Sequence, residues 1–168
     1  MTDDRSGTSV ARVTISIATM NSREQLEACL RTLPEACTGI DWSATVIDNC
    51  SDDGTAEMVR EYFPSVRLVR NAEPQGFGAN HNQVLRLVAA DAESLHFALV
   101  LNDDTSLAPG SVAALAAALA HEADAGAVVP TVFDAHGAES PVAWLDVPLR
   151  RVIAAAFVGR GVQHEDRD

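Results

Sequence analysis

Two adjacent carboxylates, Asp103 and Asp104, follow an apolar run at residues 97–101, with Asn102 between. That run has the length of one buried strand, and carboxylates at the end of such a strand cost free energy unless a cation meets them. In an open α/β sheet, ligands bind at the carboxyl ends of the strands. The pair is therefore a candidate site for Mg²⁺ or Mn²⁺, which take oxygen ligands and share them with phosphates. The alternative is an acidic turn, because Asn102 to Thr105 is also good turn chemistry.

Polar side chains also follow three other short apolar runs. The first run ends in Thr19 and Asn21, the second ends in Asp48 and Asn49, and the segment 71–82 lies past the third. Each segment alone could simply shape a turn or cap a helix. Because a parallel sheet brings the carboxyl ends of its strands to one edge, all four polar segments are expected side by side. Together they predict a ligand site at that edge.

Two glycines, Gly76 and Gly78, precede a predicted helix whose N-terminus could favour an anion. Their spacing matches neither the Walker A pattern nor the dinucleotide G-x-G-x-x-G, and a plain turn that begins a helix explains them equally well. Asn80 and Asn82 would either contact a ligand or bond backbone groups. His81 is expected on the helix surface rather than in catalysis, because no carboxylate or nucleophile is paired with it in the sequence.

Short apolar runs alternate with helical patterns along the chain. Strands are predicted at residues 13–18, 44–47, 66–69, 97–101 and 127–130, and helices around 26–33, 59–63, 79–90 and 112–119. The first helix is expected to stop before Pro34, and the fifth strand is expected at an edge of the sheet. This order predicts an α/β fold, with a Rossmann-like, mostly parallel sheet covered by helices on both faces.

Composition narrows the classes of function. The chain has 168 residues, about one domain, and carries 24 acidic against 12 basic side chains. A net charge of −12 argues against nucleic acid as a partner, because phosphate-backbone binding relies on clustered Lys and Arg. Three cysteines without C-x-x-C spacing argue against a disulfide framework or a zinc site and favour a reducing cytoplasm. We expect residues 1–10 to be a disordered N-terminus and the protein to be cytoplasmic, with membrane association only through a partner.

Four segments resemble the family 2 glycosyltransferases with a GT-A fold, and their rhamnosyltransferase-like branch in particular. They are residues 13–21, 46–55, 71–82 and 99–105, and they keep the family's order and spacing across residues 11–133. The resemblance implies that residues 11–133 form a domain that binds a UDP- or dTDP-linked sugar. Residues 134–168 would then be the start of an acceptor region, or a tail.

The resemblance also implies roles for single residues. Asp104 would be the direct metal ligand in a variant of the D-x-D motif, in which Asn102 replaces the first carboxylate and Asp103 fills the middle position. The residues expected to bind the nucleotide sugar are Thr19, Asn21, Asp48, Asn49, Gly76, Phe77, Gly78, Asn80, Asn82 and Asp103.

The implied reaction is metal-dependent transfer of a hexosyl or rhamnosyl group to an acceptor hydroxyl, with inversion at the anomeric carbon. The acceptor would be a glycan, a lipid or a small molecule. Family members usually supply the general base from an acidic motif well downstream of the D-x-D segment. No convincing copy of that motif occurs between Asp104 and residue 168, so no catalytic residue is assigned.

Two alternatives remain open. One is a non-catalytic, truncated GT-A module that binds a nucleotide or a protein partner, and self-association of such an incomplete domain is left open with it. The other is a nucleotidyltransferase. It is disfavoured because residues 15–23 contain no glycine and a single basic residue, Arg23, where a basic phosphate loop would be needed.

Overall fold

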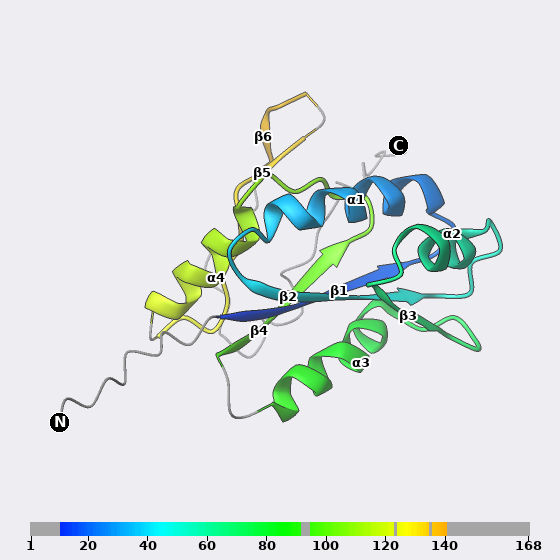
Figure 1. Cartoon of the computed structure of the whole chain (residues 1–168), viewed down its shortest axis with the longest axis horizontal. Coiled ribbons are helices and arrows are strands. Elements are labelled where there is room, and N and C mark those ends of the chain that lie inside the picture. Colours follow the sequence, from blue (N-terminus) through cyan, green and yellow to red (C-terminus); the bar gives the residue numbers. More distant parts are fainter. Residues whose placement is uncertain (1–10, 92–94, 123, 135, 141–168) are drawn as a thin grey trace, which may run out of the picture. The chain divides into compact units, whose positions relative to one another are not determined.

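The computed structural model describes residues 11–91, 95–122, 124–134 and 136–140. Strands and helices alternate in its first part, as predicted (Figure 1). The elements there are β1 (Arg12–Thr19), α1 (Arg23–Ala36), β2 (Asp41–Asp48), α2 (Thr55–Tyr62), β3 (Arg67–Arg70), α3 (Phe77–Ala90), β4 (His96–Asn102) and α4 (Ser111–His121). The expected disordered N-terminus and most of the expected acceptor region or tail lie outside the described residues.

The four strands form one parallel sheet in the order β3-β2-β1-β4. Helix α3 packs on β1, β2 and β4 from one side, while α1 and α2 lie on the other side (Figure 1). The predicted α/β architecture with helices on both faces of a parallel sheet is confirmed. Because all four strands run the same way, their carboxyl ends meet at one edge.

The main core lies between the sheet and helices α1, α2 and α4. Ile15 and Ile17 of β1 point into it together with Val46 of β2, because side chains two residues apart share one face of a strand. Leu26 and Leu33 of α1 cover them, because residues seven positions apart lie on the same face of a helix, two turns from each other. This packing fixes β1 within the sheet, and β1 in turn fixes the position of the loop that follows it.

The face of the sheet toward α3 is more polar, and it buries a histidine. Oγ of Ser16 in β1 and Nδ1 of His81 are hydrogen-bonded at 2.8 Å, and His81 is 2% exposed. The prediction that His81 lies on the helix surface is therefore wrong. His81 precedes the inward-facing Val84 by three residues, which is the spacing of one helical face, and this signal was available in the sequence. Burial lowers the pKa of His81 to about 4.

Protonation of His81 is expected to destabilise the fold in acid. Its pKa is about 4 in the folded chain and about 6.5 in the unfolded chain, so the unfolded chain takes up the proton first as the pH falls. The free energy of unfolding is therefore at its full value above pH 6.5 and decreases as the pH falls toward 4. The loss amounts to about 3 kcal/mol. Urea unfolding at pH 7.5 and pH 4 should therefore show a larger drop in the wild type than in His81→Gln. Equal drops in both proteins would contradict the buried neutral histidine.

Helix α1 continues to Ala36, although it was expected to stop before Pro34. Pro34 stands in the last turn, so the helix loses only the bond that its missing N–H would have made. Leu33 and Ala36 on either side are buried, and the N–H of Cys37 still bonds the Leu33 carbonyl at 2.9 Å. Packing against the core therefore outweighs the local preference of proline.

The fifth strand predicted at residues 127–130 does not form within the described part of the chain. Residues 127–130 are exposed, and Pro130 has no N–H to give to a ladder. Instead, β5 (Val132–Phe133) and β6 (Glu139–Ser140) pair as a short antiparallel hairpin. Contacts within the chain assign this hairpin to a second unit that begins at Val129, separate from the first unit, which ends at Val128. The predicted domain limits at residues 11, 133 and 134 stay predictions.

None of the helices in the described ranges is both long enough and apolar enough to cross a membrane.

Candidate functional site

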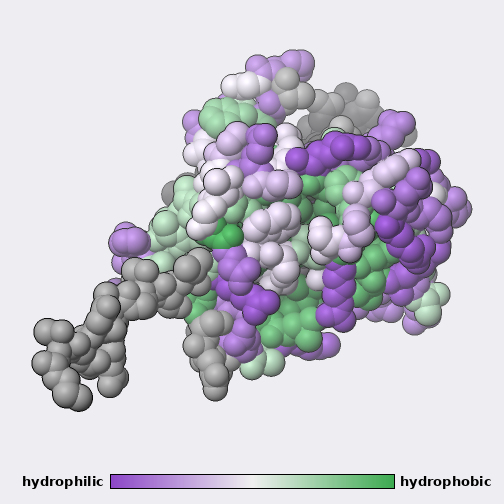
Figure 2. Space-filling model, viewed as in Figure 1, coloured by the Kyte–Doolittle hydropathy of each residue, from purple (hydrophilic) through white to green (hydrophobic). Residues whose placement is uncertain are grey.

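The register of the sheet aligns four polar strand ends. Thr19 pairs with Asp48 across β1 and β2, and Asp48 pairs with Arg70 across β2 and β3. On the other side Ala18 pairs with Asn102, so that Asp103 follows beside Thr19. Figure 2, which has the same orientation as Figure 1, shows hydrophilic residues gathered on the surface over α2 and the neighbouring loops. The edge therefore carries the candidate residues of all four segments.

Asp48 is fully buried; its Oδ1 is hydrogen-bonded, whereas its Oδ2 has an ionic partner but, among the described residues, no hydrogen bond of good geometry. Oδ1 accepts a hydrogen bond from the N–H of Ser51 at 2.9 Å, and Oδ2 lies 3.2 Å from Nε of Arg70. Arg70 also donates from Nη2 to the Ser51 carbonyl at 2.5 Å. The ion pair and these two bonds hold the loop after β2 in place. Sequence reasoning missed Arg70, whose signal was a cation at the end of the strand next to that of Asp48.

The loop after β1 is bonded to the loop after β2. The N–H of Asn21 donates to Oγ of Ser51 at 3.0 Å, and the Asn21 side chain accepts from the N–H of Asp52 at 2.9 Å. Asn21 adopts a positive φ of 52°, a conformation that asparagine tolerates better than most residues. The hydroxyl of Thr19 is buried and, among the described residues, makes no hydrogen bond of good geometry. Thr19 thus places a hydroxyl beside Asp103 at the centre of the edge.

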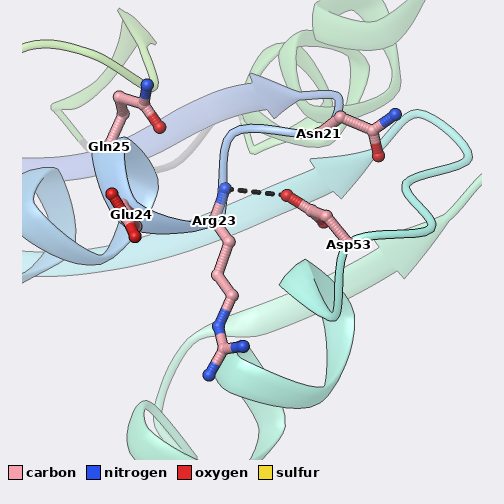
Figure 3. Close-up of a pocket in the computed structure, with 5 residues that line it drawn as sticks. All are labelled: Asn21, Arg23, Glu24, Gln25 and Asp53. Atoms are coloured by element: carbon pink, nitrogen blue, oxygen red, sulfur yellow. Dashed lines mark hydrogen bonds between the residues drawn. The ribbon is translucent and has the colours of Figure 1, made fainter.

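A polar pocket of about 350 Å³ opens where helices α1 and α2 begin (Figure 3). It is lined by Asn21, Arg23, Glu24, Gln25 and Asp53. The N–H of Arg23 donates to Asp53 at 3.1 Å, which ties the first turn of α1 to the start of α2 (Figure 3). Burial would raise the pKa of Asp53, but hydrogen bonds from Thr55 and from the Arg23 N–H outweigh it and lower the pKa. Asp53 is therefore ionised, and its carboxylate joins the beginning of α1 to the beginning of α2.

The segment after β3 is held by side-chain amides. Asn49 bonds the backbone of Gln75 through both ends of its amide, and Asn80 is 3% exposed and bonds Asn71. Asn49 and Asn80 were predicted to touch the ligand, and the structure places them in contacts that shape the loop. Asn82 lies exposed on α3.

Gly76, Phe77 and Gly78 form the exposed beginning of α3. Gly76 has an ordinary φ of −67°, so neither a turn nor a positive φ requires glycine there. A Cβ added to Gly76 or Gly78 would meet nothing within 4 Å, which leaves open space in front of the helix N-terminus. The ring of Phe77 is 46% exposed and meets His81 edge to face, with 4.4 Å between ring centroids. The glycines therefore leave room at the site instead of relieving strain in the chain.

Asp103 and Asp104 differ in their surroundings. Asp104 is exposed, whereas Asp103 is partly buried. Burial raises the pKa of Asp103, and the hydroxyls of Thr19 and Ser22 oppose that shift. Nearby Cys29 has its pKa raised to about 12, first by burial and then by the charges of Asp103 and Asp104. Cys29 therefore stays a neutral thiol at physiological pH.

The carboxylate pair suits a metal that is shared with a ligand. Within the described ranges no group of three or more His, Cys, Asp or Glu side chains could enclose a metal ion. Mg²⁺ and Mn²⁺ are commonly held by one or two carboxylates and complete their shell with water and phosphate oxygens. Asp103 and Asp104 fit this arrangement, in which two carboxylates hold the ion together with water and phosphate oxygens.

Comparison with known proteins gives concordant findings. A family model described as glycosyl transferase family 2 matches residues 14–151. An N-acetylglucosaminyl-diphospho-decaprenol L-rhamnosyltransferase of Mycobacterium tuberculosis is 32% identical over 107 residues, which cover 60% of this chain and 35% of the relative. The chain thus spans about a third of that relative's length.

Two solved structures are similar in fold. A mannosyltransferase from Pyrobaculum calidifontis, in complex with GDP-Man and Mn²⁺, aligns with a TM-score of 0.51 and 25% identity over 64% of this chain and 31% of its own. TarS from S. aureus, in complex with UDP, aligns with a TM-score of 0.52 and 22% identity over 66% of this chain and 32% of its own.

Proposed function

The chain belongs to glycosyl transferase family 2 and has its GT-A fold, and from this membership we propose that it binds a nucleoside-diphosphate sugar for inverting glycosyl transfer. The observation that carries the proposal is the register of the sheet. It aligns Arg70, Asp48, Thr19 and the Asp103–Asp104 pair along one edge, which is where ligands bind in open α/β sheets.

Each part of the edge has its own role in the proposal. Thr19 and the loop braced by Asp48 and Arg70 bind the base and ribose. The beginning of α3, with open space at Gly76 and Gly78, receives the sugar. Asp104, with Asp103 beside it, holds Mg²⁺ or Mn²⁺. When bound, that ion acts as a Lewis acid that neutralises charge on the leaving diphosphate.

The names of the similar proteins support particular donors and acceptors. The mycobacterial relative points to an L-rhamnosyl donor and to a diphosphate-linked lipid acceptor. The solved neighbours hold GDP-Man with Mn²⁺ in one case and UDP in the other. We therefore keep dTDP, UDP and GDP as donor nucleotides to be distinguished by experiment. No residue of the chain is assigned as general base, and a cytoplasmic location stays a prediction.

A thermal-shift titration tests the donor site. Wild-type protein is heated with UDP, dTDP or GDP, each with Mn²⁺ or with a chelator. One nucleotide is expected to raise the melting temperature in a metal-dependent way, because a ligand at 100 times its Kd adds about 2.7 kcal/mol of stability.

No shift with any of the three nucleotides at millimolar concentration would contradict the proposed donor site. A shift without turnover of the matching sugar nucleotide, in the presence of lipid-linked acceptor, would favour the alternative of a binding module that does not catalyse transfer.

A further inference from the structure

Four amide side chains and the backbone of a fifth amide residue connect the ends of β2 and β3 with the first turns of α3. We call them the amide cluster, and its members are Asn49, Asn71, Gln75, Asn80 and Gln83. Gln75 takes part through its backbone, and the other four take part through their side-chain amides. None of the five is adjacent to another in the sequence, so the cluster exists only in the folded chain.

One backbone group determines the orientation of the amides. The N–H of Gln75 can only donate, and it lies 2.8 Å from Oδ1 of Asn49. Nδ2 of Asn49 then faces the Gln75 carbonyl at 3.1 Å. Asn71 must present its own Nδ2 to the same Asn49 oxygen, at 2.9 Å, and that Nδ2 also donates to Oδ1 of Asn80 at 2.7 Å. Its Oδ1 is left to accept from Gln83 at 3.1 Å.

Asn71 is therefore the centre of the amide cluster. Its side-chain Nδ2 makes two bonds and its Oδ1 makes one. Its backbone N–H donates to the Asp48 carbonyl at 2.9 Å, and its carbonyl accepts from Sγ of Cys50 at 3.3 Å. The backbone bonds attach Asn71 to the end of β2 and to the loop after it, and the side-chain bonds join Asn71 to Asn49 in that loop and to Asn80 and Gln83 of α3.

The part that Asn71 attaches is otherwise exposed. Residues 72–79 lie at the surface, between Asn71 and the buried Asn80. This stretch contains Gly76 and Gly78, in front of which the space is open. By contrast, Asp48 and Ser51 are held by Arg70 and by each other, and the side chain of Asn71 reaches the loop after β2 at the Asn49 amide.

We propose that Asn71 is a positioning residue for the sugar part of the donor, because its side-chain amide orients Asn49 and Asn80, which bond the Gln75 backbone and so hold residues 72–78 beside the nucleotide site. The inference rests on the proposed function. It separates two parts of the site: the Asp48–Arg70 side, which binds the nucleotide, and the loop held by Asn71, which receives the sugar.

The isosteric variant Asn71→Asp tests this role. It puts a carboxylate oxygen where Nδ2 stood, facing Oδ1 of Asn49 and of Asn80, and the Asn49 amide cannot turn over without losing both bonds to Gln75. Amide hydrogen exchange of residues 75–80 should become faster. By calorimetry with Mn²⁺, Kd should rise about tenfold or more for the sugar nucleotide and stay within about threefold for the nucleoside diphosphate.

The ligand pairs are dTDP-rhamnose with dTDP, UDP-glucose with UDP and GDP-mannose with GDP, and the pair used is the one that the wild type binds. Arg86→Gln, an exposed position of α3, is the control because it changes the net charge by the same amount. Asn71→Ala removes the bonds without adding repulsion. It should therefore also weaken the sugar nucleotide more than the nucleoside diphosphate, by a smaller factor, and it keeps the test possible if Asn71→Asp folds poorly.

The outcomes are distinct. Faster exchange together with a selective loss of the sugar nucleotide supports the positioning role. Equal losses for both ligands, or no loss for either, overturn it while the wild type still binds its nucleotide. If the wild type binds no member of any pair, the proposed function itself fails and the role of Asn71 in donor binding fails with it.

Discussion

Replacing Arg70 with alanine is expected to lower the free energy of unfolding by about 3 kcal/mol, because it leaves a buried carboxylate without its cation. Asp48 is fully buried, whereas the Arg70 side chain is 45% exposed. Among the described contacts, the variant would keep the Ser51 N–H on the Asp48 carboxylate and would lose the ion pair and the bond to the Ser51 carbonyl. Urea unfolding at pH 7 measures the effect.

The same strand offers a matched control. Arg67 is exposed on β3, and Arg67→Ala should change stability by no more than about 0.5 kcal/mol. In an Asp48→Asn background the buried charge is gone, so Arg70→Ala should cost only about 1 kcal/mol. If Arg70→Ala in the wild type costs no more than Arg67→Ala, the ion pair does not support the loop after β2.

Asp104→Asn is expected to weaken metal-dependent nucleotide binding about a hundredfold, which corresponds to about 2.7 kcal/mol. The substitution keeps the shape of the side chain but removes the charge that a hard divalent cation needs. Because Asp104 is exposed, the fold should keep its stability. Calorimetric titration of the preferred nucleoside diphosphate, with Mn²⁺ and with a chelator, measures the metal-dependent part.

Asp124→Asn, another exposed carboxylate of the described chain, is the charge-matched control and should bind like the wild type. A variant Asp104→Asn whose affinity still rises with Mn²⁺ as in the wild type would show that the metal is held elsewhere. A loss of equal size with Mn²⁺ and with the chelator would instead place Asp104 on the nucleotide and not on the metal.

Much of the fold could be predicted from the order of apolar runs alone. Residues 13–18 and 97–101 lie within β1 and β4, because a β-branched or apolar run of that length needs burial on both sides. The alternation of strands and helices then implies parallel strands, and parallel strands place their carboxyl ends together. For this reason Thr19, Asp48 and Asp103 could be expected at one edge before the structure was known.

Local preferences failed where packing decided the outcome. Pro34 remains within α1 because the turns around it are buried, and the run at 127–130 stays exposed, next to a proline that cannot join a ladder. His81 is buried because the inward face of α3 extends one turn before Val84. These outcomes depend on how much surface each segment buries, which its own sequence does not specify.

The sequence by itself determined the family, the order of the elements and which residue types stand at the strand ends. Only the tertiary structure decided what those residues do to one another. Asp48 meets Arg70 because the register of β2 and β3 aligns residues 22 positions apart, and Asn49 reaches Gln75 across 26 positions. Hydrogen bonds and ion pairs act over about 3 Å, so partners that are distant in the chain are chosen by the packing of the sheet and not by their spacing.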